Sequence, residues 1–316
     1  MHAALVTSFD QPPRYTEVPD PVPGPGEVLV HVLAAGLHPR VRSGAAGTHY
    51  TSDGVLPLVP GFDGVGRTDD GRRVFFAGLH APRGSMAELV AVPEGRLVEL
   101  PPGLDDVTLA AAMNPAMSAW LALRHRADLQ PGESVLVLGA TGNAGRLAVQ
   151  LARYAGANRV VGAGRDPASL DAVLRLGADA VVPLTADDAA ERFAREAADV
   201  DVVVDYVWGA PTELALAAVT GARADPAHPL RWVHVGATAG PTITLPAATL
   251  RKTNVQVSGS GQGSVSPAGM LAAVTELAVV LPQVRPAVDV VTAPLREVEA
   301  AWGATTASGT RIVLVP

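Results

Sequence analysis

Apolar and polar residues follow different patterns in the two parts of this chain. Near the start, residues 27–33 alternate with a period of two, which predicts a strand with one buried face. From residue 134 onward, continuous apolar runs such as 135–138 and 202–204 are typical of strands covered on both faces. Segments with apolar residues at helical spacing separate these runs. The pattern therefore predicts a β-rich domain followed by an α/β domain with a doubly wound parallel sheet.

The same patterns predict the remaining elements. In the first part, short strands broken by Gly and Pro are predicted at residues 3–7, 61–66, 73–76, 87–92 and 96–100. In the second part, strands are predicted at 159–166, 180–183, 201–207, 231–236, 255–258 and 310–315, and helices at 146–155, 167–176, 187–197, 212–220 and 267–280. Residues 109–123 are helical in pattern but contain Pro115, which must kink or restart the helix. We place the join between the two domains there.

A glycine-rich turn lies between the first buried strand of the second part and the helix after it. Gly139, Gly142 and Gly145 have the spacing GxxGxxG rather than the commoner GxGxxG. Glycines let the backbone turn tightly and let a diphosphate approach, while the amide groups and the dipole of the helix favour an anion. The turn predicts a dinucleotide site formed by Ala140, Thr141, Gly142, Asn143 and Ala144. The alternative is that the glycines serve only close packing.

The end of the next strand bears on the choice of dinucleotide. NAD-specific proteins place an acidic residue about 20 residues after the turn, where it binds the ribose hydroxyls. Here Gly164 is followed by Arg165, which would pair with a 2′-phosphate and favours NADP(H). NAD(H) becomes the better interpretation if Asp166 points inward, and Arg165 could also be a solvated residue at the start of a helix.

Other residues are placed near the cofactor by the expected topology. Ligands of doubly wound sheets bind at the carboxyl ends of the strands. We therefore expect cofactor contacts after the strands at 201–207 and 231–236, from Val207, Trp208, Gly236, Ala237 and Thr238. Ordinary turn chemistry after a strand is the alternative for each of them.

Composition excludes several kinds of chemistry. The chain of 316 residues contains no cysteine, so disulfides, thiolate nucleophiles and cysteine-ligated zinc or iron–sulfur sites are impossible. Its eight histidines show no paired spacing typical of metal ligands. A net charge of −7 without an evident basic face argues against a nucleic-acid partner. No apolar run approaches 18 residues and the start lacks the features of a signal peptide, so we expect no membrane partner and a cytoplasmic protein.

Five motifs follow one another along the chain: PLVPGFDGVG at residues 57–66, GSMAE at 84–88, LQPGESVLV at 129–137, LGAD at 176–179 and GTRIVL at 309–314. Together they resemble the medium-chain dehydrogenase/reductase superfamily, in its zinc-free quinone oxidoreductase branch. The resemblance covers nearly the whole chain. It implies a GroES-like catalytic domain at 1–117 and 257–316, and a Rossmann dinucleotide-binding domain at 118–256.

The departures from the family pattern are informative. Zinc-dependent members carry Gly-His-Glu where this chain has Gly61, Phe62 and Asp63, and Phe62 cannot bind zinc. With no cysteine ligand either, a zinc alcohol dehydrogenase mechanism is excluded on chemical grounds. The quinone reductase branch often has Asn-Pro in the first catalytic loop, where this chain has His38 and Pro39.

The resemblance implies hydride transfer from NADPH to a quinone or an α,β-unsaturated carbonyl compound. Such an acceptor needs one donor near its oxygen, for which Tyr50 is the first candidate and His49 and His38 are the next. A hydrogen-bonded packing role is the alternative for each. Ser118, in a segment that resembles the family's small-residue motif, is expected beside the nicotinamide; Asn114 could bind its carboxamide and Arg311 the cofactor phosphates.

Two other functions remain open. Some relatives are enoyl reductases that act on unsaturated acyl thioesters, but such substrates would need a basic cluster that this sequence does not show. A protein that binds NADPH without useful turnover is the other, because His38 replaces the usual asparagine. Family members commonly pair through an edge strand of the cofactor domain, so we expect a homodimer formed by residues 255–258.

Overall fold

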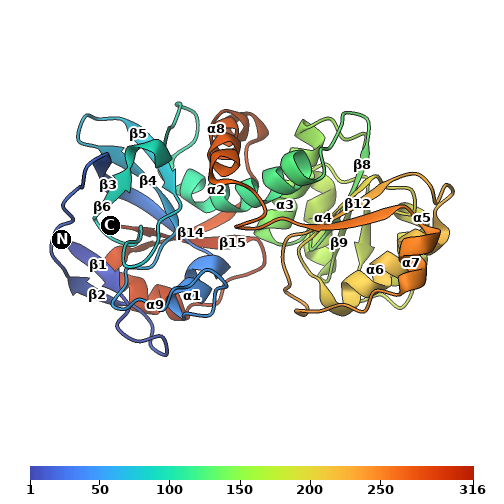
Figure 1. Cartoon of the computed structure of the whole chain (residues 1–316), viewed down its shortest axis with the longest axis horizontal. Helices are drawn as coiled ribbons and strands as arrows, with labels where there is room; N and C mark the ends of the chain where they lie inside the picture. The colour runs from blue at the N-terminus through green and yellow to red at the C-terminus, as the bar shows by residue number, and fades with distance from the viewer. The chain divides into compact units, whose positions relative to one another are not determined.

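The computed structural model describes residues 1–316 and separates into two compact units (Figure 1). Unit 1 comprises Met1–Asn114, Val274–Gln283 and Val288–Pro316, and unit 2 comprises Pro115–Ala273 and Val284–Ala287. Residues 257–273, which the resemblance assigns to the catalytic domain, thus lie in unit 2. One bond that holds them there runs from the Arg126 guanidinium to the Ser264 carbonyl oxygen, at 3.4 Å.

Unit 2 is built on a six-stranded parallel sheet. Its strands are β8 (Ser134–Leu138), β9 (Arg159–Gly164), β10 (Ala180–Pro183), β11 (Val202–Asp205), β12 (Leu230–His234) and β13 (Val255–Gly259). Their order in the sheet is β10-β9-β8-β11-β12-β13, and every neighbouring pair is parallel. The order reverses between β8 and β11, where such sheets bind their ligands. The predicted doubly wound α/β fold is confirmed, and β13 is an edge strand as expected.

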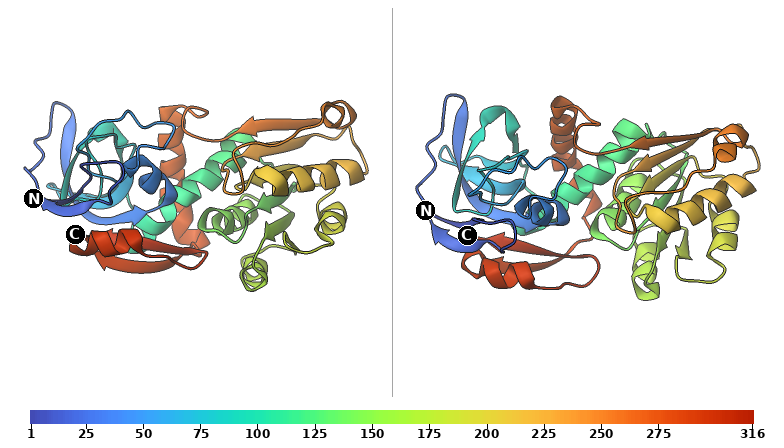
Figure 2. Two further views of the ribbon diagram at one scale, coloured as in Figure 1. Left: turned by 90° about the horizontal axis from the view of Figure 1, so that it is seen from below. Right: turned by 60° about the horizontal axis from the view of Figure 1, so that its bottom comes forward.

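Helices connect these strands and bury the continuous apolar runs. They are α3 (Asn143–Tyr154), α4 (Pro167–Arg175), α5 (Ala189–Glu196), α6 (Gly209–Ala222) and α7 (Ala247–Lys252). α3 packs against β8 and β9, α4 against β9 and β10, and α5 against β10 and α6. Figure 2 shows the helices of this unit flanking the strands. Leu136, Val203, Phe193 and Trp232 are among the buried side chains of its core.

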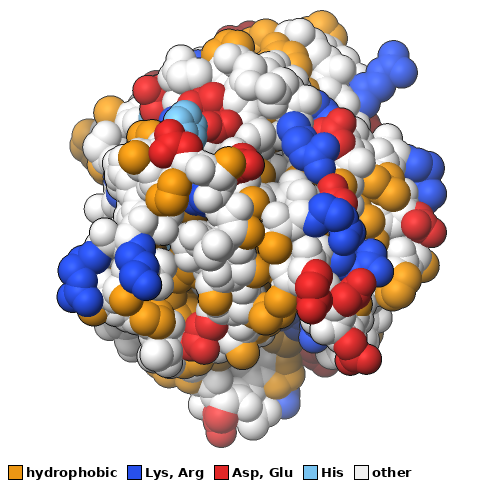
Figure 3. Space-filling model, turned by 90° about the vertical axis from the view of Figure 1, so that its right-hand side faces the viewer, with side chains coloured by type: hydrophobic (Ala, Val, Ile, Leu, Met, Phe, Trp, Pro, Cys, Tyr) orange, Lys and Arg blue, Asp and Glu red, His pale blue; other side chains and the backbone are white.

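The surface of the molecule carries charges of both signs. In the view of Figure 3, acidic and basic side chains adjoin one another in several groups, and neutral surface lies between these groups.

Unit 1 contains a mixed sheet and a two-stranded hairpin. The strands are β1 (His2–Leu5), β2 (Arg14–Glu17), β3 (Glu27–Leu37), β4 (Asp63–Thr68), β5 (Arg73–Ala77), β6 (Leu89–Pro93), β7 (Leu97–Glu99), β14 (Asp289–Pro294) and β15 (Thr310–Val315). The large sheet has the order β14-β15-β3-β4-β5-β7 with β6 also on β3, while β1 pairs with β2. The helices α1 (Pro39–Ala45) and α9 (Val298–Gly303) also belong to this unit.

The strand β3 is longer than its alternating pattern predicts. The expected strand ends at residue 33, but β3 continues to Leu37 through small residues. A Cβ atom on Gly36 would lie 2.6 Å from the Ala110 carbonyl oxygen, so the backbone of helix α2 (Asp106–Trp120) packs directly on this part of the strand. Small residues here reflect close packing, which an alternation of apolar and polar residues does not reveal.

Helix α2 continues through Pro115, so the helix does not restart there. A π-helical turn, Leu121–Arg126, follows it directly. Unit 1 passes into unit 2 between Asn114 and Pro115, within this helix.

Helix α8 (Pro267–Val284) qualifies the expectation that no apolar stretch is long enough to span a membrane. Its length and composition would suffice for crossing a bilayer. The buried helices of water-soluble proteins meet the same two criteria. In α8 33% of the stretch is buried, including Ala273, Leu277 and Leu281, and Glu276 interrupts its apolar sequence.

Candidate functional site

The glycine turn of unit 2 has the backbone geometry that an anion site requires. Gly139 has a φ of 85°, which favours glycine, and its amide and that of Ala140 both donate to the Ala163 carbonyl oxygen at 2.9 Å. Gly142 is the N-cap of α3 and provides no side-chain cap. The amide groups at the start of α3 are therefore presented at the carboxyl edge of the sheet, where the helix dipole favours a negative charge.

The three glycines of the turn have different roles. A Cβ atom on Gly145 would lie 2.1 Å from the Gly139 carbonyl oxygen, so this glycine is required by packing alone. A Cβ atom on Gly142 would have its nearest neighbour at 3.7 Å, in ordinary contact. Packing therefore explains Gly145, but it does not explain why position 142 lacks a side chain.

The end of β9 approaches the turn closely. A Cβ atom on Gly164 would lie 2.4 Å from Thr141 Cγ2. Asp166 is the N-cap of α4 and accepts a hydrogen bond from the Ser169 amide at 2.9 Å, and together with the Ser169 hydroxyl this holds its pKa below the usual value. The carboxylate of Asp166 is thus engaged in capping a helix, while Arg165 is exposed next to Gly164.

A buried carboxylate organises the segment after β11. Asp205 is fully buried and accepts hydrogen bonds from four donors: the amides of Val207 at 2.9 Å and Trp208 at 3.0 Å, Thr212 Oγ1 at 2.7 Å and Trp232 Nε1 at 3.0 Å. These bonds hold Trp208 at a φ of 54°, which is uncommon for a residue other than glycine. Asp205 was not among the predicted site residues; the one sign of it in the sequence is an acidic residue at the end of an otherwise apolar strand.

The segments after β11 and β12 are joined to each other. The Ala239 amide donates to the Val207 carbonyl oxygen at 2.7 Å, and Thr238 Oγ1 donates to the Tyr206 carbonyl oxygen at 3.1 Å. Val207 also reaches the glycine turn, since a Cβ atom on Gly139 would lie 3.1 Å from Val207 Cγ1. The structure thus brings Val207 to the turn, with Thr238 on the adjoining segment.

Further predicted residues lie on the same two segments or on α2. The Gly236 amide donates to the Asp205 carbonyl oxygen at 3.2 Å, and Ala237 follows it on the surface.

Two aromatic residues of these segments are in contact. The Trp208 and His234 ring centres are 4.3 Å apart, and burial lowers the pKa of His234. Burial raises the pKa of Tyr206, an effect that the Ser118 side chain opposes. Ser118 therefore lies beside this segment, whereas Asn114 is the last residue of the first segment of unit 1.

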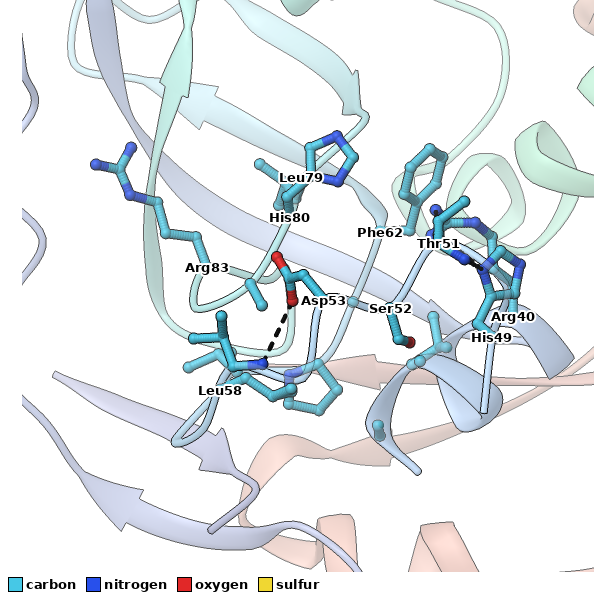
Figure 4. A pocket seen from close by; sticks show the side chains of 18 of the residues that line it. Arg40, His49, Thr51, Ser52, Asp53, Leu58, Phe62, Leu79, His80 and Arg83 are labelled. Atoms are coloured by element: carbon cyan, nitrogen blue, oxygen red, sulfur yellow. Dashed lines mark hydrogen bonds between the residues drawn. The ribbon is translucent and has the colours of Figure 1, made fainter. Parts of the chain in front are cut away.

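Unit 1 contains a pocket that is open to solvent (Figure 4). It lies beside α1, and residues of the loops before β4 and after β5 line it. The Arg40 guanidinium carbon lies 3.5 Å from the centre of the Phe62 ring, in a cation–π contact. Figure 4 shows Arg40, His49 and Thr51 gathered on one side of the pocket and Arg83 on the other.

Of the three predicted donors, His49 lines this pocket. Its Nδ1 accepts a hydrogen bond from the Thr51 amide at 3.2 Å and lies 2.7 Å from Thr51 Oγ1. Because Nδ1 is an acceptor, a neutral His49 carries its proton on Nε2. Tyr50 stacks on His49 with ring centres 4.3 Å apart, but its side chain is 71% exposed and does not line the pocket.

His38 forms a buried pair away from the pocket lining. Its Nε2 lies 3.1 Å from Asp63 Oδ1, and both side chains are only 2% exposed. Arg311 lies in the same buried region, where its Nη1 donates to the Leu37 carbonyl oxygen at 3.3 Å. Burial lowers the pKa of Arg311 to about 10, and the Asp63 charge opposes this shift. No group of three His, Asp or Glu side chains in the chain is arranged to hold a metal ion.

The sequence of this chain is similar to those of known oxidoreductases. Residues 144–278 match the family model described as zinc-binding dehydrogenase. The chain is 33% identical to a probable NADPH-dependent quinone reductase from Emericella nidulans, over the full length of both chains. It is 32% identical to a 2-methylene-furan-3-one reductase from Solanum lycopersicum over 57% of this chain and 50% of that protein.

A solved structure has the same fold as this chain over the full length of both. The quinone oxidoreductase from Thermus thermophilus, which was also solved in complex with NADPH, is 30% identical, with a TM-score of 0.79 and complete coverage of both chains. The fold, the glycine turn and these full-length matches point to one family. The chain belongs to the quinone oxidoreductase branch of the medium-chain dehydrogenase/reductase superfamily and is an oxidoreductase.

Proposed function

We propose that this protein transfers a hydride from NADPH to a quinone. The observation that carries the proposal is the glycine turn of unit 2, set in a chain that matches a named NADPH-dependent quinone reductase from end to end. The Thermus thermophilus relative, solved with NADPH, supports the same cofactor.

The residues of unit 2 fit this dinucleotide. Position 142 has space where a diphosphate would lie, and α3 begins without a side-chain cap. Arg165 is exposed next to Gly164, and the one nearby carboxylate that could prefer NAD(H), Asp166, caps α4. The residues that would hold the cofactor are Ala140, Thr141, Gly142, Asn143, Ala144, Gly164 and Arg165, with Val207, Gly236, Ala237 and Thr238 beside them. When bound, NADPH supplies the hydride.

The residues of unit 1 would bind the acceptor and stabilise the charge that develops on its oxygen. His49 has the hydrogen-bond donor Nε2–H at the pocket, and the Arg40 cation lies on the same side. We therefore favour His49 over the exposed Tyr50 as the donor. An acceptor of this kind is already electrophilic, so we also propose that no zinc ion takes part.

An α,β-unsaturated carbonyl compound is the second candidate acceptor. The 2-methylene-furan-3-one named for the Solanum lycopersicum relative has a carbon–carbon double bond conjugated to a carbonyl group. Hydride addition to such a compound also produces an oxyanion, so the same donor would serve. Reduction of acyl thioesters and binding of NADPH without turnover remain weaker alternatives.

Oxidation of NADPH with a panel of acceptors tests this function. We expect absorbance at 340 nm to fall when a benzoquinone or naphthoquinone is added, and to fall more slowly or not at all with a crotonyl thioester. Binding of NADPH without oxidation by any acceptor would contradict the enzyme proposal. Gel filtration of the same sample tests the proposed homodimer, for which the edge strand β13 is the candidate surface.

Replacing Arg165 with Ala is expected to weaken NADPH binding by about tenfold or more, because the 2′-phosphate would lose a charged partner. NADH lacks this phosphate, so its affinity should change little. Fluorescence titration of both cofactors measures the two effects. Arg175, exposed at the end of α4, is the matched control; an Arg165→Ala variant that binds NADPH like the Arg175→Ala variant would refute the assignment.

A further inference from the structure

His49 and Thr51 belong to one short turn that is anchored to α1. The His49 amide donates to the Ser43 carbonyl oxygen in α1 at 3.1 Å, and the Ser52 amide donates to the His49 carbonyl oxygen at 2.9 Å. These bonds hold the peptide groups before and after His49. The turn brings Thr51, two residues later, back to the His49 side chain at the pocket (Figure 4).

Both polar groups of Thr51 that can donate meet the same atom of His49. The Thr51 backbone amide donates to Nδ1 at 3.2 Å, so Nδ1 presents a lone pair and carries no hydrogen. Thr51 Oγ1 lies 2.7 Å from Nδ1, a distance at which two lone pairs would repel each other. The Thr51 hydroxyl therefore donates its hydrogen to Nδ1.

The Arg40 guanidinium favours the same orientation of the hydroxyl. Its Nη2 lies 3.5 Å from Thr51 Oγ1, at the long limit of a hydrogen bond, and a guanidinium can only donate. A positive charge on this side attracts the lone pairs of Oγ1 and repels its hydrogen, which then points at His49. The cation–π contact with Phe62 holds Arg40 in this place.

A hydrogen bond accepted at Nδ1 determines what the rest of the His49 ring can do. It keeps the ring in one orientation, because a flipped ring would place Cδ2 against the two donors of Thr51. It also polarises the ring, so that Nε2–H becomes a stronger donor. Burial lowers the pKa of His49, and the charges of Arg40 and His38 lower it further, so the ring is neutral at pH 7 and keeps its hydrogen on Nε2.

We propose that Thr51 is a positioning residue for the reduction, because its hydroxyl holds His49 with Nε2–H presented to the acceptor oxygen. The inference rests on the proposed function, in which His49 donates to that oxygen. Arrival of the hydride places negative charge on the oxygen, and a donor fixed beforehand stabilises this charge without reorganisation. The contribution of Thr51 is therefore expected in kcat more than in the binding of either substrate.

Removal of the hydroxyl alone tests the proposal. Thr51→Val keeps the shape of the side chain and the backbone amide. We expect its kcat with a naphthoquinone to fall about tenfold, less than the loss of roughly a hundredfold that follows when an oxyanion donor is removed altogether, as in His49→Phe. The KM for NADPH should not change. Thr51→Ser restores a hydroxyl and should restore kcat.

Thr48 provides the matched control. It lies in the same loop, its hydroxyl donates to the Ser43 carbonyl oxygen at 3.3 Å, and it does not line the pocket. Thr48→Val should keep the kcat of the wild type. Equal kcat values for the wild type and Thr51→Val, an equal fall in Thr48→Val, or no recovery in Thr51→Ser would overturn the proposal.

Nuclear magnetic resonance of protein with ¹⁵N-labelled histidine provides a readout independent of turnover. In the wild type without substrates, we expect the two His49 nitrogens, assigned by their loss in His49→Phe, to differ widely in chemical shift, with only Nε2 protonated. In Thr51→Val the two shifts should move toward each other as other tautomers and ring orientations become populated, and Thr51→Ser should resemble the wild type. A protonated Nδ1 in the wild type, or unchanged shifts in Thr51→Val, would refute the assignment.

The two readouts separate this proposal from the proposed function. If no quinone is reduced but the His49 signals respond to Thr51→Val as expected, the proposed function fails while the hydrogen bond from Thr51 to His49 stands. If the wild type and Thr51→Val reduce quinones at the same rate, the function stands and the positioning role of Thr51 fails.

Discussion

Replacing Gly145 with Ala is expected to destabilise unit 2 by about 3 kcal/mol, because the added methyl group would lie 2.1 Å from the Gly139 carbonyl oxygen and 2.6 Å from Ala140 Cα. The contacting atoms are backbone and cannot move aside as a flexible side chain would. Thermal unfolding followed by circular dichroism measures the loss.

Gly142→Ala is the matched comparison. At this position φ is −80° and the nearest atom to the added methyl group is 3.7 Å away, so the free energy of unfolding should change by less than about 1 kcal/mol. The methyl group would nevertheless stand where a diphosphate approaches α3, and we expect NADPH to bind at least about tenfold more weakly. Normal NADPH binding by a folded Gly142→Ala protein would contradict the proposed position of the cofactor.

Replacing Asp205 with Ala is expected to lower the free energy of unfolding by about 4 kcal/mol. The substitution leaves two backbone amides, the Thr212 hydroxyl and the Trp232 indole without their acceptor inside the protein. It also releases Trp208 from the bond that supports its positive φ. Urea unfolding followed by tryptophan fluorescence should show the loss directly, because Trp208 and Trp232 both report on this region.

Two variants control for this measurement. Asp205→Asn keeps the shape but offers fewer acceptors, so we expect a smaller loss. Asp171→Ala removes an exposed carboxylate from α4 and should change the free energy of unfolding by less than about 0.5 kcal/mol. A loss no larger for Asp205→Ala than for Asp171→Ala would show that the buried carboxylate does not organise the segment after β11.

The elements with a strong local pattern could be predicted from the sequence. The continuous apolar runs gave the strands of unit 2, and β10 begins and ends at the predicted residues. The elements β2, α1, α7, β14 and α9 were missed. β2 is mostly exposed, α1 has seven residues with few apolar ones, and β14 is an edge strand that is largely exposed. Their structure depends on partners distant in the sequence, which a local pattern cannot show.

The candidate site likewise contains local features that the sequence predicts and long-range contacts that it does not. The glycine turn was predictable because all its glycines lie within one strand–turn–helix segment. The pairing of His38 with Asp63, and the bonds from Thr212 and Trp232 to Asp205, join residues that are far apart in the sequence. The packing role of Gly145 and the space at Gly142 likewise required coordinates, because both residues are glycines in a regular spacing.

The pairing of β15 with β3 has a consequence for the order of synthesis and folding. β15 pairs with β3, and Arg311 within it reaches the Leu37 carbonyl oxygen across 274 positions of the sequence, so the sheet of unit 1 lacks two of its strands until β14 and β15 have been synthesised. Most of unit 2 comes from one uninterrupted stretch, Pro115–Ala273, which precedes β14 and β15. During synthesis, unit 2 should therefore complete its sheet before unit 1 does.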